Sequence, residues 1–243
     1  MKFIISKKKS LIVSFLLVFA CAASYKILTH EVTYTKGINY EVKEYKIPLY
    51  LKICSFLDRH FHYKYLAQTI TYGLNSESAK ILAIFNWVQS NIKPQPDALP
   101  TVDDHPLNII IRGYGAGDQF EDVFTLLCNY SGVAAYMAVL ESSASNDKIT
   151  LSFVFYKEKW RVFHVAKNLM FYVNNEWASF EELLNARNNE IRNIEQPINV
   201  GGKITYLEYF RGFKGFYREY KDRYLLQTPF GRVETKVQKF KMP

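Results

Sequence analysis

Cysteine is scarce in this chain, which has only three among its 243 residues. Cys21 lies in an N-terminal apolar run, whereas Cys54 and Cys128 fall among apolar residues of predicted helices. Cysteines spaced this widely exclude a disulfide framework and a zinc site. We therefore predict that Cys54 and Cys128 are separate buried thiols, and we expect no metal and no cofactor.

Positive charge is scarce in the middle of the chain, although the formal net charge is +8. Four lysines precede residue 11, and residues 201–243 hold ten Lys or Arg against four Asp or Glu. Residues 11–200 are therefore slightly acidic. Because a nucleic-acid-binding protein usually spreads a basic stripe over its fold, we predict that nucleic acid is not a partner.

The N-terminal apolar run is shorter than a comfortable membrane span. It covers residues 11–25 and directly follows three consecutive lysines, whereas a span needs about 20 residues. Lysines before a short apolar stretch are typical of a targeting segment, which we assign to residues 1–28. Three outcomes stay open: an uncleaved anchor with its lysines inside, cleavage at the A-x-A site of residues 20–22, and lipidation at the lipobox-like residues 18–21. Each predicts export of residues 30–243 to the bacterial cell envelope, outside the cytoplasm.

Helical and extended patterns follow this segment. Residues 30–47 alternate loosely in polarity, which predicts an extended arm, and Pro48 opens a helical stretch that ends at Gly73. We assign residues 29–77 to this arm and helix. Asn75 and Ser76 can cap the next helix, whose buried stripe has the spacing i, i+3, i+4, i+7, i+11. Its members are Ile81, Ile84, Phe85, Val88 and Ile92.

The apolar period then changes from 3.6 to 2. Residues 133–142, 149–157, 160–167 and 168–173 predict consecutive antiparallel strands, with a hairpin connection at 157–159. A capping box at residues 179–182 predicts a helix over residues 179–193. Because helices come first and a strand meander follows, we predict an α+β domain over residues 78–198.

Several motifs in this order resemble the transglutaminase-like superfamily, over roughly residues 78–185. The matching residues are Trp87-Val88, Arg112-Gly113-Tyr114-Gly115, Asp118-Gln119, Gly132-Val133 and the strand pair of residues 153–163. The resemblance implies a papain-like core of N-terminal helices packed on an antiparallel β-sheet. It also implies a cysteine at a helix N-terminus, where the amides and the dipole stabilise a thiolate. A histidine and an aspartate on strands would complete its triad.

The resemblance places the three family positions on residues without the required groups. The cysteine position falls on Gly117, the histidine position on Ile149 and the aspartate position on His164. Losing a triad typically costs on the order of 10⁴–10⁶ in rate. We therefore expect a catalytically degenerate member that serves as a binding or scaffold module for a peptide, glycan or protein partner.

The resemblance implies a cleft around the cysteine position, and the residues of this cleft have two alternative roles. They either hold a ligand or only maintain the turn and the core. An enzyme of different chemistry also stays open, with Asp118, His164 or the Asp104-His105 loop as acid and base, or with acyl transfer through a non-standard residue set. The predicted cleft residues are Arg112, Tyr114, Asp118, Gln119, Trp160, Asp104 and His105.

The C-terminal extension, residues 199–243, is aromatic and basic. Aromatic residues from Tyr206 to Tyr224 follow a 4-3-4-3-4 spacing, which predicts one face of a helix. That face either docks on the domain's own core or lies on anionic lipid or acidic glycan. The second alternative would make the chain a membrane-surface protein. The cations predicted for such a surface are Arg211, Lys214, Arg218 and Lys221.

Overall fold

A computed structural model describes residues 7–36, 43–100, 105–187, 190–199, 202 and 204–241. The chain divides into two compact units, residues 1–58 and 59–243. Helix α2 (Leu49–Ile70) begins in the first unit and ends in the second. The two units are described separately below.

The first unit holds an apolar helix and a β-hairpin. Helix α1 (Lys7–Thr29) contains a stretch of 18 residues, Ile12–Thr29, that is long and apolar enough to cross a membrane. It is the one such helix among the described residues, and a signal sequence has the same properties. Strands β1 (Glu31–Lys36) and β2 (Lys43–Pro48) pair antiparallel, as the extended arm predicted. Cys54 is exposed on α2, so the prediction of a second buried thiol was wrong.

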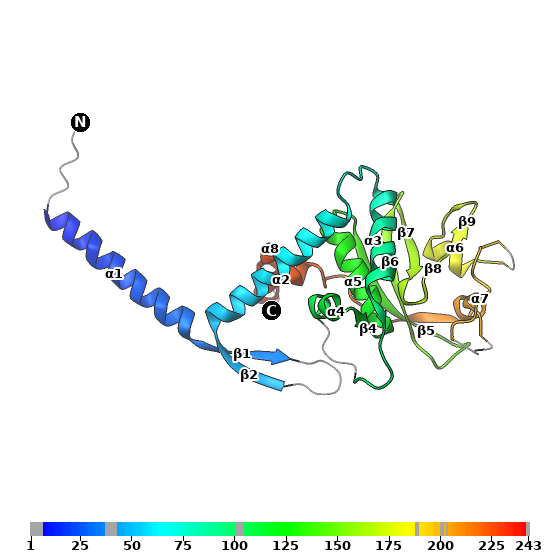
Figure 1. Cartoon of the computed structure of the whole chain (residues 1–243), viewed down its shortest axis with the longest axis horizontal. Coiled ribbons are helices and arrows are strands. Elements are labelled where there is room, and N and C mark those ends of the chain that lie inside the picture. Colours follow the sequence, from blue (N-terminus) through cyan, green and yellow to red (C-terminus); the bar gives the residue numbers. More distant parts are fainter. Residues whose placement is uncertain are drawn as a thin grey trace. The chain divides into compact units, whose positions relative to one another are not determined.

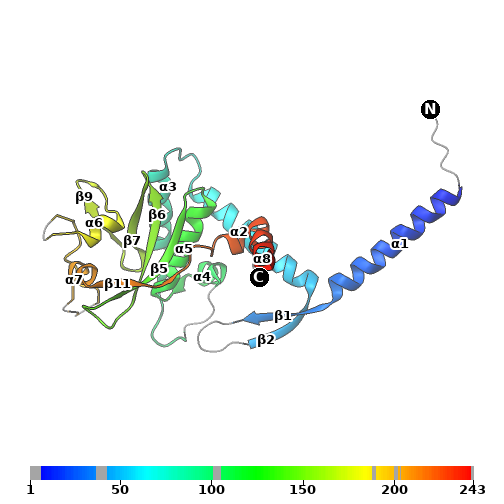
Figure 2. The same ribbon diagram turned by 180° about the vertical axis from the view of Figure 1, so that it is seen from behind.

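The second unit is a five-stranded antiparallel sheet with helices on both faces (Figures 1 and 2). The strand order is β11-β5-β6-β7-β8. Its strands are β5 (Ala135–Ser142), β6 (Ile149–Tyr156), β7 (Lys159–His164), β8 (Leu169–Met170) and β11 (Phe213–Glu219). The remaining strands, β3 (Lys93–Pro94), β4 (Tyr114–Gly115), β9 (Tyr172–Val173) and β10 (Glu176–Trp177), form two small pairs. The α+β prediction is confirmed.

Helices α3 (Glu77–Asn91), α4 (Pro106–Arg112) and α5 (Gly117–Tyr130) cover one face of the sheet. The apolar cluster beneath them, here the helix-side core, includes Phe85, Phe124 and Phe163. Ser76 caps α3, since its side chain accepts from the Ala79 amide at 3.2 Å. The predicted stripe on this helix is buried as expected.

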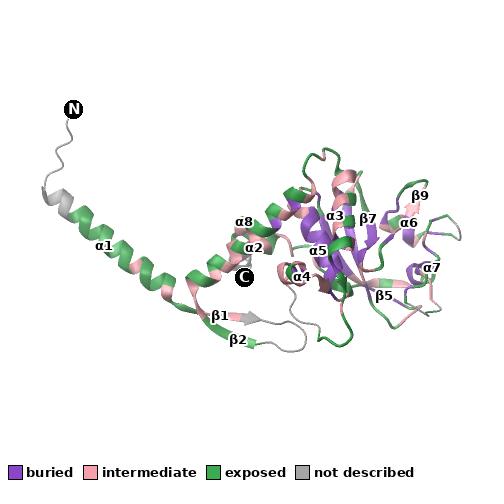
Figure 3. Cartoon of the chain, viewed as in Figure 1, coloured by how far each residue is buried: buried purple, intermediate pink, exposed green. Residues whose placement is uncertain are grey.

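Helices α6 (Phe180–Leu184) and α7 (Tyr206–Arg211) cover the opposite face. The apolar cluster beneath them, here the far-side core, takes alternate residues of each strand, such as Leu151 and Phe153 of β6. Figure 3 shows that α5 and the central strands hold most of the buried residues of this unit. The side-chain period of two therefore assigns neighbouring strand residues to different cores.

Two predicted elements, one helix and one strand, are shorter than expected. The capping box of Ser179 and Glu182 starts α6 as predicted, but the helix ends at Leu184 instead of residue 193. Ile191 and Ile194 enter the far-side core instead, so tertiary burial overrides local helix preference. The strand predicted for residues 168–173 likewise divides into β8 and β9.

The predicted C-terminal aromatic helix was also wrong over most of its length. Helix α7 ends at Arg211, and residues 213–219 form strand β11 beside β5. Gly212 closes the helix where any Cβ would lie 2.6 Å from Ser142 Oγ. The hydrogen bonds and side-chain contacts offered by the edge of β5 outweigh the helical spacing. The chain then forms the 3₁₀ turn η2 (Leu225–Gln227) and helix α8 (Pro229–Lys241).

Candidate functional site at the N-terminus of helix α5

A tight turn positions the first residue of α5. Gly113 ends α4 in the left-handed conformation, at φ 72°, and its amide donates to Ile109 O at 2.9 Å. Strand β4 then pairs in parallel with β3. Glycine suits this turn because it adopts positive φ without steric cost. The turn delivers the chain to Gly117, where α5 begins.

Arg112 and Gln119 brace this turn. The Arg112 guanidinium donates to Tyr114 O at 2.8 Å and to Gln119 Oε1 at 2.6 Å. The same Oε1 accepts from the Ala116 amide at 3.0 Å. Gly115 leaves room for this oxygen, since a Cβ there would lie 2.9 Å from it. Of the predicted cleft residues, these two therefore maintain the turn.

Gly117 and Asp118 are exposed at the first turn of α5. A Cβ added to Gly117 would lie 3.9 Å from Ala166 Cβ, which is ordinary van der Waals contact. Packing therefore leaves room for a side chain at the position that the resemblance assigns to the cysteine.

A buried acid lies one helical turn behind Gly117. The Glu121 carboxyl accepts from the Ala166 amide at 3.0 Å through Oε1, and the Ser152 hydroxyl donates to its Oε2. Both side chains are fully buried. Burial raises the pKa of Glu121 to about 8, and hydrogen bonds from Ser152 and Ala166 only partly oppose it. The carboxyl is therefore mostly protonated at neutral pH.

Sequence analysis missed this acid. Glu121 lies three and seven residues before Phe124 and Cys128, which are both in the helix-side core. That spacing places a carboxyl on the buried face of α5 and was the available signal. Its partner Ser152 alternates with Leu151 and Phe153, so it points toward α5. Their pairing across elements depends on the tertiary structure.

Ile149 and His164 belong to the other side of the sheet. Ile149 is part of the far-side core. His164 is 7% exposed, and its Nδ1 shares a hydrogen bond of 2.5 Å with the hydroxyl of Tyr206 in that core. Burial lowers the pKa of His164 to about 3, aided by the charge of Lys167. The imidazole is therefore neutral, and it is separated from Gly117 by the sheet.

The other predicted cleft residues lie at different places. Trp160 is the second residue of β7, roughly 13 Å of extended chain before His164 at about 3.3 Å per residue. Its ring contacts Tyr136 and Phe155 edge-on. His105 occupies the N-cap of α4, at the opposite end of this helix from Arg112. Asp104 lies outside the described residues. The structure thus collects Arg112, Tyr114, Asp118 and Gln119 at one turn but leaves Trp160 and His105 elsewhere.

The remaining thiol of this unit is inaccessible. Cys128 is 0% exposed on α5, three turns beyond Gly117. Burial raises the pKa of its thiol well above the ordinary range, so thiolate does not form at neutral pH. Cys128 is a packing residue, as predicted.

The predicted cationic surface is a strand edge and the turn after it. Arg211, Lys214 and Arg218 are exposed at the end of α7 and on β11. Lys221 pairs with Glu219 at 2.7 Å. The aromatic partners Tyr206 and Phe210 are buried in the far-side core. The first part of the tail therefore docks on the domain's own core and leaves its cations in solvent.

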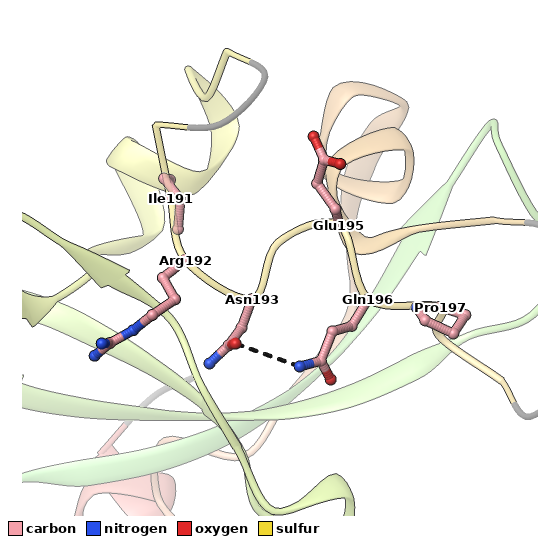
Figure 4. A pocket seen from close by; sticks show the side chains of 6 residues that line it. All are labelled: Ile191, Arg192, Asn193, Glu195, Gln196 and Pro197. Carbon is pink, nitrogen blue, oxygen red and sulfur yellow. Dashed lines mark hydrogen bonds between the residues drawn. The ribbon is translucent and has the colours of Figure 1, made fainter.

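A shallow pocket of about 550 Å³ opens along residues 191–197 (Figure 4). Gln196 Nε2 donates to Asn193 Oδ1 at 3.3 Å, and Asn193 Nδ2 donates to Met170 O at 2.8 Å. The Arg192 guanidinium lies 4.1 Å from the centre of the Tyr172 ring. Two amides, a guanidinium and the Glu195 carboxylate line the pocket together with Ile191 and Pro197. The helix predicted from sequence ended at residue 193 within this segment, and the pocket was not predicted.

Metal coordination has no candidate in the part of the chain that the structure describes, since no group of three or more His, Cys, Asp or Glu side chains gathers there.

The model of the transglutaminase-like superfamily matches residues 64–181. The chain carries a transglutaminase-like domain. The match runs from the C-terminal part of α2 to the start of α6 and includes α4, β4 and α5, which form the turn at Gly117. No curated protein matches the chain.

Solved structures similar to this transglutaminase-like chain share little sequence with it. A candidate cysteine protease from Cytophaga hutchinsonii is 17% identical, with a TM-score of 0.40 over 53% of this chain and 45% of that one. A candidate protease from Parabacteroides distasonis is 13% identical, with a TM-score of 0.36 over 54% and 35%. A TGase is 14% identical, with a TM-score of 0.37 over 84% and 59%. This chain therefore spans about a third to three fifths of their lengths.

Proposed function

We propose that this protein is a catalytically inactive transglutaminase-like module of the bacterial cell envelope that binds a peptide, glycan or protein partner. The observation that carries the proposal is Gly117 at the exposed first turn of α5. An acyl transfer there needs a nucleophile, and a glycine has none. Loss of a triad leaves only residual rate enhancement from positioning.

The surrounding side chains also argue against a substitute triad. Ile149 is apolar, and His164 is neutral and held by Tyr206 on the other face of the sheet. Ser152 is fully buried and donates to Glu121, so its hydroxyl has no access to a substrate. Asp118 is exposed, whereas His164 is buried and bonded to Tyr206, which argues against an acid and base formed by this pair.

The proposed ligand binding rests on the pocket of residues 191–197. Paired amides and a guanidinium held over a ring suit hydroxyl, carbonyl or carboxylate groups, which peptides and glycans offer. The exposed amides at the start of α5 suit similar groups. Helix α1 supplies a targeting segment for export or anchoring.

The test of inactivity uses the full chain with amine donors, glutamine peptides and thiol-reactive probes. We expect no turnover. Robust turnover that is abolished by Asp118→Asn or Ser152→Ala would overturn the proposal.

The test of binding uses peptide and glycan arrays. Arg192→Ala and Gln196→Ala are expected to weaken binding of the best ligand by about tenfold each, as for the loss of a charged or neutral hydrogen bond. Glu181→Ala, at an exposed position of α6, is the matched control. Unchanged binding in both pocket variants would contradict the assignment of the pocket.

A further inference from the structure

Helix α8 presents large apolar side chains to solvent. Phe230 is 90% exposed and Val233, one turn later, is 62% exposed. Leu225 and Leu226 of η2, just before the helix, are each about 40% exposed. We call these four residues the α8 patch. Leaving such side chains in water forgoes about 1.5–3 kcal/mol for each that could be buried, and adjacent exposed apolar residues mark interaction surfaces.

The start of this helix is fixed to the domain. Arg223 forms an ion pair with Asp122 of α5, through Nε to Oδ1 at 2.5 Å and a second contact from Nη2 to Oδ2. Tyr224 packs edge-on against Tyr130 at 5.2 Å, and the Tyr130 hydroxyl donates to Gln227 O at 3.1 Å. The α8 patch is therefore exposed on a helix whose start is anchored to the domain.

Local geometry also fixes the first turn of α8. Thr228 Oγ1 accepts from the Gly231 amide at 3.2 Å, and Thr228 O accepts from the Arg232 amide at 3.0 Å. Gly231 lies against η2, where a Cβ would be 2.6 Å from Leu225 O. This close approach sets the direction in which Phe230 and Val233 leave the domain.

The charge of the helix indicates what covers the patch. Residues 229–241 contain four Lys or Arg and one Glu, a net charge of +3 within 13 residues. An apolar surface on a strongly basic helix favours an anionic phospholipid surface, where apolar side chains enter the interface and cations meet the headgroups. A second copy of the same helix would bring two like charges of +3 together. The chain also carries α1, a candidate membrane span.

We propose that α8 is a membrane-interface helix that inserts the α8 patch into an anionic phospholipid bilayer. This inference is independent of the binding function proposed above, because it uses neither the turn at Gly117 nor the pocket of residues 191–197. It also differs from the surface predicted from sequence, which comprised Arg211, Lys214, Arg218 and Lys221.

The experiment places an indole on the patch by Phe230→Trp in the full chain. The protein is reconstituted into vesicles of phosphatidylcholine alone or with phosphatidylglycerol, and the emission of the unsubstituted chain is subtracted. The matched control is Tyr72→Trp, since Tyr72 is 89% exposed in the turn after α2. Val233→Asp in the Phe230→Trp background tests the patch itself, with circular dichroism to verify the fold.

In anionic vesicles we expect the fluorescence emission of the indole at position 230 to shift to shorter wavelength. Acrylamide should quench this indole several-fold less than the indole at position 72. High salt, zwitterionic vesicles and Val233→Asp should each remove this protection, since surface attraction contributes about fivefold per cation near the membrane. Equal protection in both kinds of vesicle would overturn the charge-based proposal. Protection that depends on protein concentration and not on lipid would assign the patch to a second copy. No protection at all would also overturn it.

Discussion

On the α5 face of the central sheet, Glu121 is bonded to Ser152, whereas on the opposite face His164 is bonded to Tyr206. Both pairs are buried next to the same strands, β6 and β7. Burial raises the pKa of the acid to about 8 and lowers that of the base to about 3. Each side chain is thus held in its neutral form, which is what a core requires and the opposite of what an ion-pair triad uses.

The turn at Gly117 differs from the two strand positions, Ile149 and His164, that the resemblance assigns to a triad. Around Gly117 the turn, the helix start and the bracing by Arg112 and Gln119 are all present. Ile149 belongs to the far-side core, and His164 is bonded to Tyr206 of that core. The first turn of α5 is therefore exposed, whereas His164 and Tyr206 are buried.

The largest effect is expected from breaking the far-side core. Tyr206→Ala should lower the free energy of unfolding by about 3–5 kcal/mol, because it deletes a fully buried ring and leaves His164 without this partner. Chemical denaturation measures the change. Tyr72→Ala, at an exposed ring, is the control and should cost much less. Equal losses in the two variants would contradict the burial of Tyr206.

A second effect follows from the protonation of Glu121. The folded protein holds this proton up to about pH 8, whereas the carboxyl of the unfolded chain loses it near pH 4.5. The stability from neutral Glu121 is therefore full below pH 4.5 and declines as the pH rises to 8. Glu121→Gln should remove this decline, which is on the order of a few kcal/mol.

Urea denaturation between pH 6.5 and 8 isolates this contribution as the difference in slope between the unsubstituted chain and Glu121→Gln, because both chains contain the same histidines. Asp118→Asn, at an exposed carboxylate three residues earlier, is the control and should keep the decline. A wild-type stability that rises over this range, or a Glu121→Gln variant with an unchanged slope, would show that Glu121 is ionised in the fold.

His164 should act in the opposite direction. The unfolded chain gains a proton near pH 6.5, whereas the folded protein excludes it down to about pH 3. The stability from neutral His164 is therefore full above pH 6.5 and is lost as the pH falls toward 3. His164→Gln should flatten the loss between pH 4.5 and 3, where Glu121 is protonated in the fold. Thermal unfolding measures it, and His62→Gln, at an exposed histidine, is the control. If His164→Gln leaves the slope intact, another group carries this dependence.

The smallest effect on stability is expected at the exposed first turn of α5. Gly117→Cys should change the free energy of unfolding by less than about 1 kcal/mol, because a Cβ there meets only Ala166 at 3.9 Å. Its thiol should react with maleimide under native conditions, while Cys128 should not. We expect no acyl transfer, since Ile149 is apolar and the His164 imidazole is bonded to Tyr206. Transglutaminase activity in this variant would mean that a partner for the thiol exists after all.

Much of the frame could be predicted from sequence because local signals agree with the fold. Ser76 and Ser179 start helices by capping, and Gly113 adopts the left-handed conformation that its turn needs. The strand pattern predicted β5, β6 and β7 to within three residues. Arg112 and Gln119, which are close in sequence, lie at one turn, whereas Trp160 lies elsewhere because its position depends on β7.

Sequence by itself determined the elements of this protein, the glycine at the start of α5 and the absence of a thiol there, because capping, period and residue identity are local properties. Only the tertiary structure decided that Glu121 meets Ser152, that His164 faces Tyr206, and that residues 213–219 join the sheet instead of a helix. The reason is physical. Burial and hydrogen bonding between residues far apart in the chain outweigh local preference by several kcal/mol, and a side-chain period of two sends neighbouring strand residues into different cores.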